Sequence, residues 1–160
     1  LTAPAKDSLY NLSLQGGEGK YGFLEIIENY SGTNAANLAH YYAGMAYLNT
    51  NKYQDAIAHL DKFSSDDDVL APLAKGAIGD AFVQLGQNED ALKYYEEAAS
   101  MRTNDFTTPR FLLKAGIAAM SLSQNDKALA HFKKIADEYP KSTEATKAEI
   151  YTGRAEAMNK

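Results

Sequence analysis

The chain has 160 residues, of which 45% are hydrophobic and 23% are charged, ordinary values for one soluble globular domain. Sixteen lysines and arginines against 21 aspartates and glutamates give a formal charge of -5. We therefore expect no attraction to nucleic-acid phosphates or anionic membranes. The absence of cysteine excludes disulfides, thiolate metal ligands and a cysteine nucleophile. No apolar run approaches the roughly 18 residues that span a bilayer, so this segment is not expected to insert into a membrane.

The first 34 residues predict two helices, over about 4–14 and 22–32. Gly16, Gly17 and Gly19 lie between them and predict a loose turn. The second helix, GFLEIIENYSG, aligns with the later segment HFKKIADEYPK, so that Phe23 matches Phe132. Residues 1–34 are therefore interpreted as a degenerate copy of a unit that recurs further along the chain.

Three clearer copies follow, and their apolar spacing is typical of helices. They begin at Asn37, Pro72 and Pro109 and read NLAHYYAGMAYLNTNKYQDAIAHLDKF, PLAKGAIGDAFVQLGQNEDALKYYEEA and PRFLLKAGIAAMSLSQNDKALAHFKKI. The residues that lengthen the copies beyond the consensus period of about 34 residues lie in the polar stretches 64–68 and 100–108. Turns are predicted near Asn51, at 86–88 and at 124–125, and 142–159 predicts one more amphipathic helix.

Each copy carries a glycine, then an alanine, then a large residue at fixed intervals. The three sets are Gly44, Ala56 and Leu60; Gly79, Ala91 and Tyr95; and Gly116, Ala128 and Phe132. The glycine and alanine remove bulk where the two helices of a copy cross, and the large residue fills the space between successive copies. One helix pair cannot bury its apolar face, so stability has to come from stacking.

This pattern resembles the tetratricopeptide repeat. The resemblance implies an all-α, right-handed α-solenoid of about nine helices in one domain, 1–160. Its parts would be the degenerate repeat 1–34, the repeats 37–70, 72–105 and 109–142, and a capping helix at 142–159.

Segments such as GFLEIIENY, NLAHYYAG and EYPKSTEATKAEIYTGRAEA resemble bacterial YfgM-like tetratricopeptide proteins. That resemblance implies a periplasmic domain anchored to the inner membrane by an N-terminal helix absent from this chain. It also implies a place in an envelope, secretion or chaperone assembly.

In this architecture the first helix of each pair lines a concave groove that binds polypeptide. The resemblance assigns to the groove Leu38, Tyr41, Met45, Leu48, Asn49, Asp80, Val83, Gln84, Arg110, Leu113, Ile117 and Met120. These side chains are mostly apolar and suit an amphipathic helix or an extended apolar segment of a partner whose identity the sequence does not give. The alternatives are a groove filled by the protein's own chain, and self-association as a homodimer.

Candidate catalytic and metal-binding residues are better explained structurally. His59 and His131 occupy equivalent repeat positions, too far apart to share a metal, and His40 occupies a packing position. The acidic run 66–68 lacks the spacing of a calcium loop and predicts a solvated loop that caps the next helix. The sequence therefore predicts a non-catalytic scaffold or adaptor without cofactor; the alternative is a structural, self-associating module.

Overall fold

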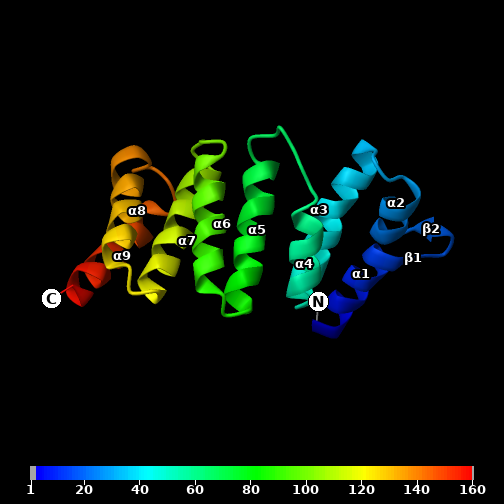
Figure 1. The fold of residues 1–160 in the computed structure, drawn as a ribbon, viewed down its shortest axis with the longest axis horizontal. Helices are drawn as coiled ribbons and strands as arrows, with labels where there is room; N and C mark the ends of the chain where they lie inside the picture. Colours follow the sequence, from blue (N-terminus) through cyan, green and yellow to red (C-terminus); the bar gives the residue numbers. More distant parts are fainter. Residues whose placement is uncertain (1–2, 160) are drawn as a thin grey trace. The chain divides into compact units, whose positions relative to one another are not determined.

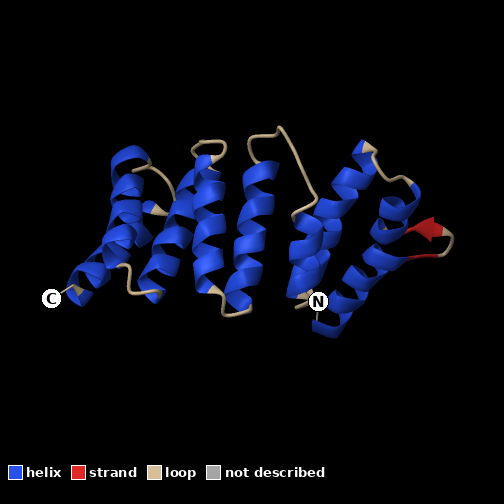
Figure 2. Cartoon of the chain, in the orientation of Figure 1, coloured by secondary structure: helices blue, strands red, loops and turns tan. Residues whose placement is uncertain are grey.

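The computed structural model describes residues 3–159, whose regular elements are helices and one short hairpin, connected by loops (Figures 1 and 2). Within this range the chain forms two compact units, 3–65 and 66–159. The division falls in the polar stretch 64–68, which the sequence marks as an insertion between two copies.

The first unit contains four helices and a two-stranded hairpin. Its elements are α1 (Ala3–Gln15), β1 (Gly16–Gly17), β2 (Lys20–Tyr21), α2 (Phe23–Asn29), α3 (Asn34–Asn49) and α4 (Tyr53–Leu60). Helices α1 and α2 pack on each other and on α3, around the buried side chains of Leu14, Ala43 and Ala46. Thr33 caps α3, because its Oγ1 accepts a hydrogen bond from the Ala36 amide at 3.2 Å.

The glycine-rich segment after α1 is more ordered than the loose turn predicted for it. Gly16 pairs with Tyr21, and Gly17 pairs with Lys20, in antiparallel register. The two loop residues both have positive φ, 52° at Glu18 and 76° at Gly19. A type I′ turn requires positive φ at both of its central residues, and the twist of this turn matches the twist of the two strands of a hairpin.

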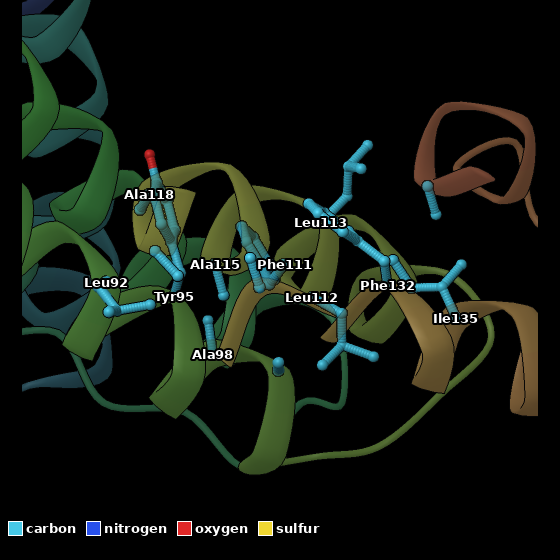
Figure 3. Close-up of a cluster of buried hydrophobic side chains, with 14 of the residues drawn as sticks. Leu92, Tyr95, Ala98, Phe111, Leu112, Leu113, Ala115, Ala118, Phe132 and Ile135 are labelled. Carbon is cyan, nitrogen blue, oxygen red and sulfur yellow. The ribbon is translucent and has the colours of Figure 1, made fainter. Parts of the chain in front are cut away.

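The second unit contains five helices, each packed against the next (Figure 1). They are α5 (Leu70–Gln84), α6 (Asn88–Ser100), α7 (Thr107–Ser121), α8 (Asn125–Glu138) and α9 (Ala145–Met158). Their shared core includes Tyr95, Phe111, Phe132 and Ile135 (Figure 3). The rings of Tyr95 and Phe111 stack with their centroids 6.5 Å apart.

The repeating glycines lie where the two helices of each pair cross. A side-chain carbon added at Gly44 would meet Leu60, one at Gly79 would meet the Tyr95 ring, and one at Gly116 would meet the Phe132 ring. The predicted close approach at these glycines is therefore confirmed.

The turns inside the three pairs also repeat. Asn51, Gly86 and Ser123 have φ values of 61°, 72° and 59°. These residues lie 35 and 37 residues apart, the same offsets that separate the glycines. One left-handed residue thus reverses the chain after the first helix of each pair.

The loops before α5 and α7 carry equivalent caps. Asp67 Oδ1 accepts hydrogen bonds from the amides of Val69 and Leu70, at 2.9 and 2.7 Å. These bonds hold the pKa of the Asp67 carboxyl below its ordinary value. The predicted capping role of the acidic run is confirmed. Asn104, 37 residues later, accepts from the amides of Phe106 and Thr107 in the same way.

The fold class predicted from the sequence is confirmed: an all-α helical-repeat solenoid, with nine helices within residues 3–159. Helix α9 is the terminal helix predicted at 142–159.

Candidate functional site

The inner face of the second unit is formed by α5 and α7, the first helices of two successive pairs. Gly76 on α5 lets these helices approach, because a side-chain carbon at this position would collide with the ring of Phe111 on α7. The close approach leaves two apolar side chains on the surface: Val83 is 40% exposed and Ile117 is 37% exposed.

An ion pair lies on the same face. Asp80 Oδ1 on α5 accepts a hydrogen bond from Tyr95 Oη on α6 at 2.6 Å. The same oxygen lies 2.5 Å from Lys114 Nζ on α7. One carboxylate oxygen therefore links three helices. The side chains of Asp80 and Lys114 are 35% and 30% exposed, so a ligand can reach both charges.

The environment keeps Tyr95 protonated as a donor. Burial raises the pKa of the phenol well above its ordinary value of 10, and the charge and hydrogen bond of Asp80 raise it further. Lys114 Nζ also lies 5.5 Å from the centroid of the Tyr95 ring. Tyr95 thus holds the carboxylate in place and leaves the lysine on the open side.

A cavity of about 230 Å³ opens beside this ion pair. It is lined by Val83, Asn88, Tyr95, Lys114, Ile117, Ala118 and Ser121. Small-molecule sites are typically ~300–1,000 Å³. This smaller cavity, apolar with polar groups at its edge, suits a side chain of a bound polypeptide better than a whole cofactor.

The structure brings several of the groove residues predicted in the second unit to this face. Val83 and Ile117 line the cavity, and Asp80 forms the ion pair. Gln84 and Arg110 are exposed, and the Arg110 guanidinium lies 5.9 Å from the centroid of the Phe111 ring.

Two other predicted residues of this unit belong largely to its interior. Leu113 is buried in the core cluster, and the half-buried Met120 packs against the same cluster. Neither offers much contact area to a ligand.

The predicted groove residues of the first unit all lie on α3. Leu38 is 39% exposed, but Tyr41 is only 9% exposed and packs against Phe63, with ring centroids 5.1 Å apart. Met45 and Leu48 are half-buried. The amide of the exposed Asn49 donates to the Met45 carbonyl at 2.8 Å.

Sequence reasoning missed Lys114, and it treated Tyr95 only as a packing residue. The available signal was charge: Asp80 and Lys114 lie 34 residues apart on equivalent helices, about one repeat period. Opposite charges at that separation on the inner helices indicate a pair across neighbouring repeats. The exposed Tyr42 was missed as well; its ring stacks on Phe23, with centroids 5.5 Å apart.

The histidines form a contact that was not predicted. Nδ1 of His40 and Nδ1 of His59 lie 3.1 Å apart, which requires one ring to donate and the other to accept. Burial is the main cause that lowers the pKa of both imidazoles. Among residues 3–159, no group of three or more His, Cys, Asp or Glu side chains is placed to hold a metal ion.

The repeated helix pairs define the class of this molecule: a tetratricopeptide-like helical-repeat protein. More particularly, the chain belongs to the family described as "T7SS, ESX-1 secretion system protein EccA1, N-terminal domain", whose model matches residues 17–149. That domain is a protein-interaction module. No curated protein matches the chain.

The family match corrects one prediction. The periplasmic localisation is wrong, because EccA1, to whose family the chain belongs, is a cytosolic component of the ESX-1 secretion system. No helix in the described part of the chain is both long and apolar enough to cross a membrane. The closer resemblance to YfgM-like proteins stays a prediction.

Proposed function

We propose that the chain is a non-catalytic interaction module of a secretion assembly, and that it binds a polypeptide along the inner face of α5 and α7. The observation that carries this proposal is the cavity beside the Asp80–Lys114 ion pair. An apolar side chain of the ligand enters between Val83 and Ile117. Polar groups next to that side chain meet the two charges.

The composition of the face supports a peptide ligand. The backbone of a peptide offers amide donors and carbonyl acceptors along its length. The half-exposed carboxylate can accept hydrogen bonds from the amides, and the ammonium group can donate hydrogen bonds to the carbonyls. The apolar edge then supplies selectivity for the side chain that enters the cavity. The predicted residues Leu38 on α3 and Arg110 on α7 are proposed as further contacts.

The test uses two substitutions on the face and one away from it. Val83→Glu and Ile117→Glu place a charge at the cavity edge, at positions exposed enough to leave the fold intact. Lys93→Glu, an exposed position on α6, is the matched control. A photocrosslinking residue at position 117 in the native cell identifies the bound protein, and the same residue at position 93 measures background.

The identified protein is then titrated with each purified variant. We expect Val83→Glu and Ile117→Glu to weaken binding by about tenfold or more, with the control unchanged, since each places a charge in an apolar contact. Equal affinity of all variants, or the same crosslinks at positions 93 and 117, would refute this site.

A further inference from the structure

One helix pair in the first unit brings two imidazole rings together. His40 lies on α3 and His59 lies on α4, and their Nδ1 atoms are 3.1 Å apart. The ring planes are inclined by 43°, and the ring centroids are 5.1 Å apart. Both side chains are half-buried, so a small solute can still reach them from the solvent.

The packing of the two helices holds these rings in place. A side-chain carbon at Gly44 would lie 2.5 Å from Cγ of Leu60, so α3 and α4 touch closely at this crossing. His40 lies one helical turn before Gly44. His59 directly precedes Leu60. The ring of Tyr47 also lies against His59, with centroids 5.3 Å apart. The separation of the two imidazoles is therefore set by helix packing and not by a flexible loop.

The other helix pairs carry different side chains at the two equivalent positions. In the second pair these are Lys75 and Tyr94, which make a cation–π contact. In the third pair Leu112 is buried in the core, and His131 contacts Glu96 of the preceding pair. The repeat fold therefore does not require two imidazoles at this crossing, and their presence in the first pair is a local feature.

The separation of the two nitrogens matches that of neighbouring ligands on one metal ion. At metal–nitrogen distances of ~2.0–2.1 Å, two ligands lie about 3.3 Å apart in a tetrahedral site and about 2.9 Å apart in a square-planar site. The observed 3.1 Å lies between these values. Rotation of the two rings about their side-chain bonds turns both lone pairs toward one ion, and neither helix has to move.

We propose that His40 and His59 form a two-histidine site for a divalent transition metal that imidazole prefers: copper(II), nickel(II) or zinc(II). In the metal-free pair, one Nδ1 carries the proton of the shared hydrogen bond. On metal binding, that ring takes its proton on Nε2 instead, both Nδ1 lone pairs coordinate the ion, and no net proton is released. Within residues 3–159 no group of three His, Cys, Asp or Glu side chains surrounds the site, so water fills the remaining positions.

The surroundings of the pair leave both rings available as ligands. Burial is the main cause that lowers the pKa of each imidazole, and metal ions bind the neutral form. Two nearby charges act on a bound cation in opposite directions. The carboxylate of Asp55 attracts it toward His59, and the ammonium of Lys62 repels it from both rings.

The first test measures affinity. Metal-stripped protein is titrated near neutral pH with each of the three ions by isothermal titration calorimetry. We expect the parent to bind one ion, and we expect His131→Gln, which removes the third histidine, to bind it equally well. His40→Gln and His59→Gln each remove one ligand and should weaken binding by about tenfold or more, since even the outer partners of metal ligands contribute ~10–100-fold. Circular dichroism verifies that each variant is folded.

Two further measurements do not depend on the folding of the histidine variants. Nitrogen-15 NMR of the zinc-loaded parent should show coordination at Nδ1 of His40 and His59, with His131 unchanged. Lys62→Gln removes an exposed positive charge and should tighten binding about two- to fivefold, the range expected for an exposed charge pair.

Three results would overturn the site. They are a parent that binds no ion, equal affinity in all the histidine variants (an adventitious ion only), and zinc coordination at His131 in place of the pair. Val83→Glu and Ile117→Glu, which alter the proposed peptide face in the second unit, should bind the metal as the parent does. The outcome is therefore independent of the proposed function.

Discussion

Crowding at the repeat glycines can be measured by making one small change at two equivalent positions. Gly79→Ala adds a methyl group that would lie 2.6 Å from Cε1 of Tyr95 and 2.8 Å from Cδ1. Gly153→Ala adds the same group where no atom lies within 4 Å. Both positions are inside α-helices, so both variants gain about 1 kcal/mol from helix propensity.

The difference between the two variants isolates the cost of the clash. The Tyr95 ring cannot move away freely, because its hydroxyl is bonded to Asp80 and its face stacks on Phe111. Overpacking of this kind costs about 1–3 kcal/mol. We therefore expect Gly153→Ala to raise the free energy of unfolding by up to about 1 kcal/mol. The free energy of unfolding of Gly79→Ala should be ~1–3 kcal/mol lower than that of Gly153→Ala.

The assay is urea unfolding followed by circular dichroism, at protein concentrations low enough to exclude association. The slope of the free energy against urea should be the same for both variants, so that the midpoints report stability directly. Equal shifts in the two variants would refute the close contact between Gly79 and Tyr95. The proposed register of the repeat would then be wrong at that pair.

Two further predictions concern polar groups. Tyr95→Phe removes the hydroxyl that donates a hydrogen bond to Asp80. Because the lost bond is to a charged group, the free energy of unfolding should fall by about 1–3 kcal/mol in the same urea assay. An unchanged urea midpoint would contradict this hydrogen bond. The lowered pKa values of His40 and His59 mean that the unfolded chain binds protons more readily than the folded one. The contribution of the two histidines to the free energy of unfolding should therefore be present above pH 6.5, the ordinary pKa of histidine, and should be lost as the pH drops below it. Replacing both histidines with glutamine should remove that part of the pH dependence measured from urea midpoints, and a loss that persists would point to other groups.

The repeat made the main features of the fold predictable. Gly44, Gly79 and Gly116 recur at nearly constant offsets, and helix crossings require small residues, so their packing role followed from sequence. The hairpin at 16–21 could not be predicted in this way. Its strands have only two residues each, too few for an alternating pattern to show.

Contacts between helices of one pair were harder to predict, although the repeat contained a signal. His40 contacts His59 in the first pair, and Lys75 lies over the ring of Tyr94 in the second. Lys75 follows His40 by 35 residues, and Tyr94 follows His59 by the same 35 residues. The positions therefore correspond while the chemistry of the contact changes. A periodic sequence identifies which positions meet, but not whether two side chains at those positions attract, titrate or only pack.

The fourth repeat glycine could have been found from the sequence, since Gly153 follows Gly116 by the same 37 residues. In the other copies the alanine lies 12 residues after the glycine, and the corresponding position after Gly153 falls outside the 160 residues compared, so the full pattern could not be matched there. The open space beside it could not have been predicted, because it depends on which helix packs there.

The sharing of one carboxylate oxygen by Tyr95 and Lys114 also determines how the inner face responds to ionic strength. Because Asp80 already neutralises the ammonium of Lys114, the pair projects little long-range field into the solvent. The polypeptide that we propose to bind there would be held by short-range hydrogen bonds and apolar contacts, which dissolved salt screens weakly. Such a complex should survive concentrated salt washes that strip proteins held by surface charge alone, and its rate of association should vary little between dilute and concentrated buffer.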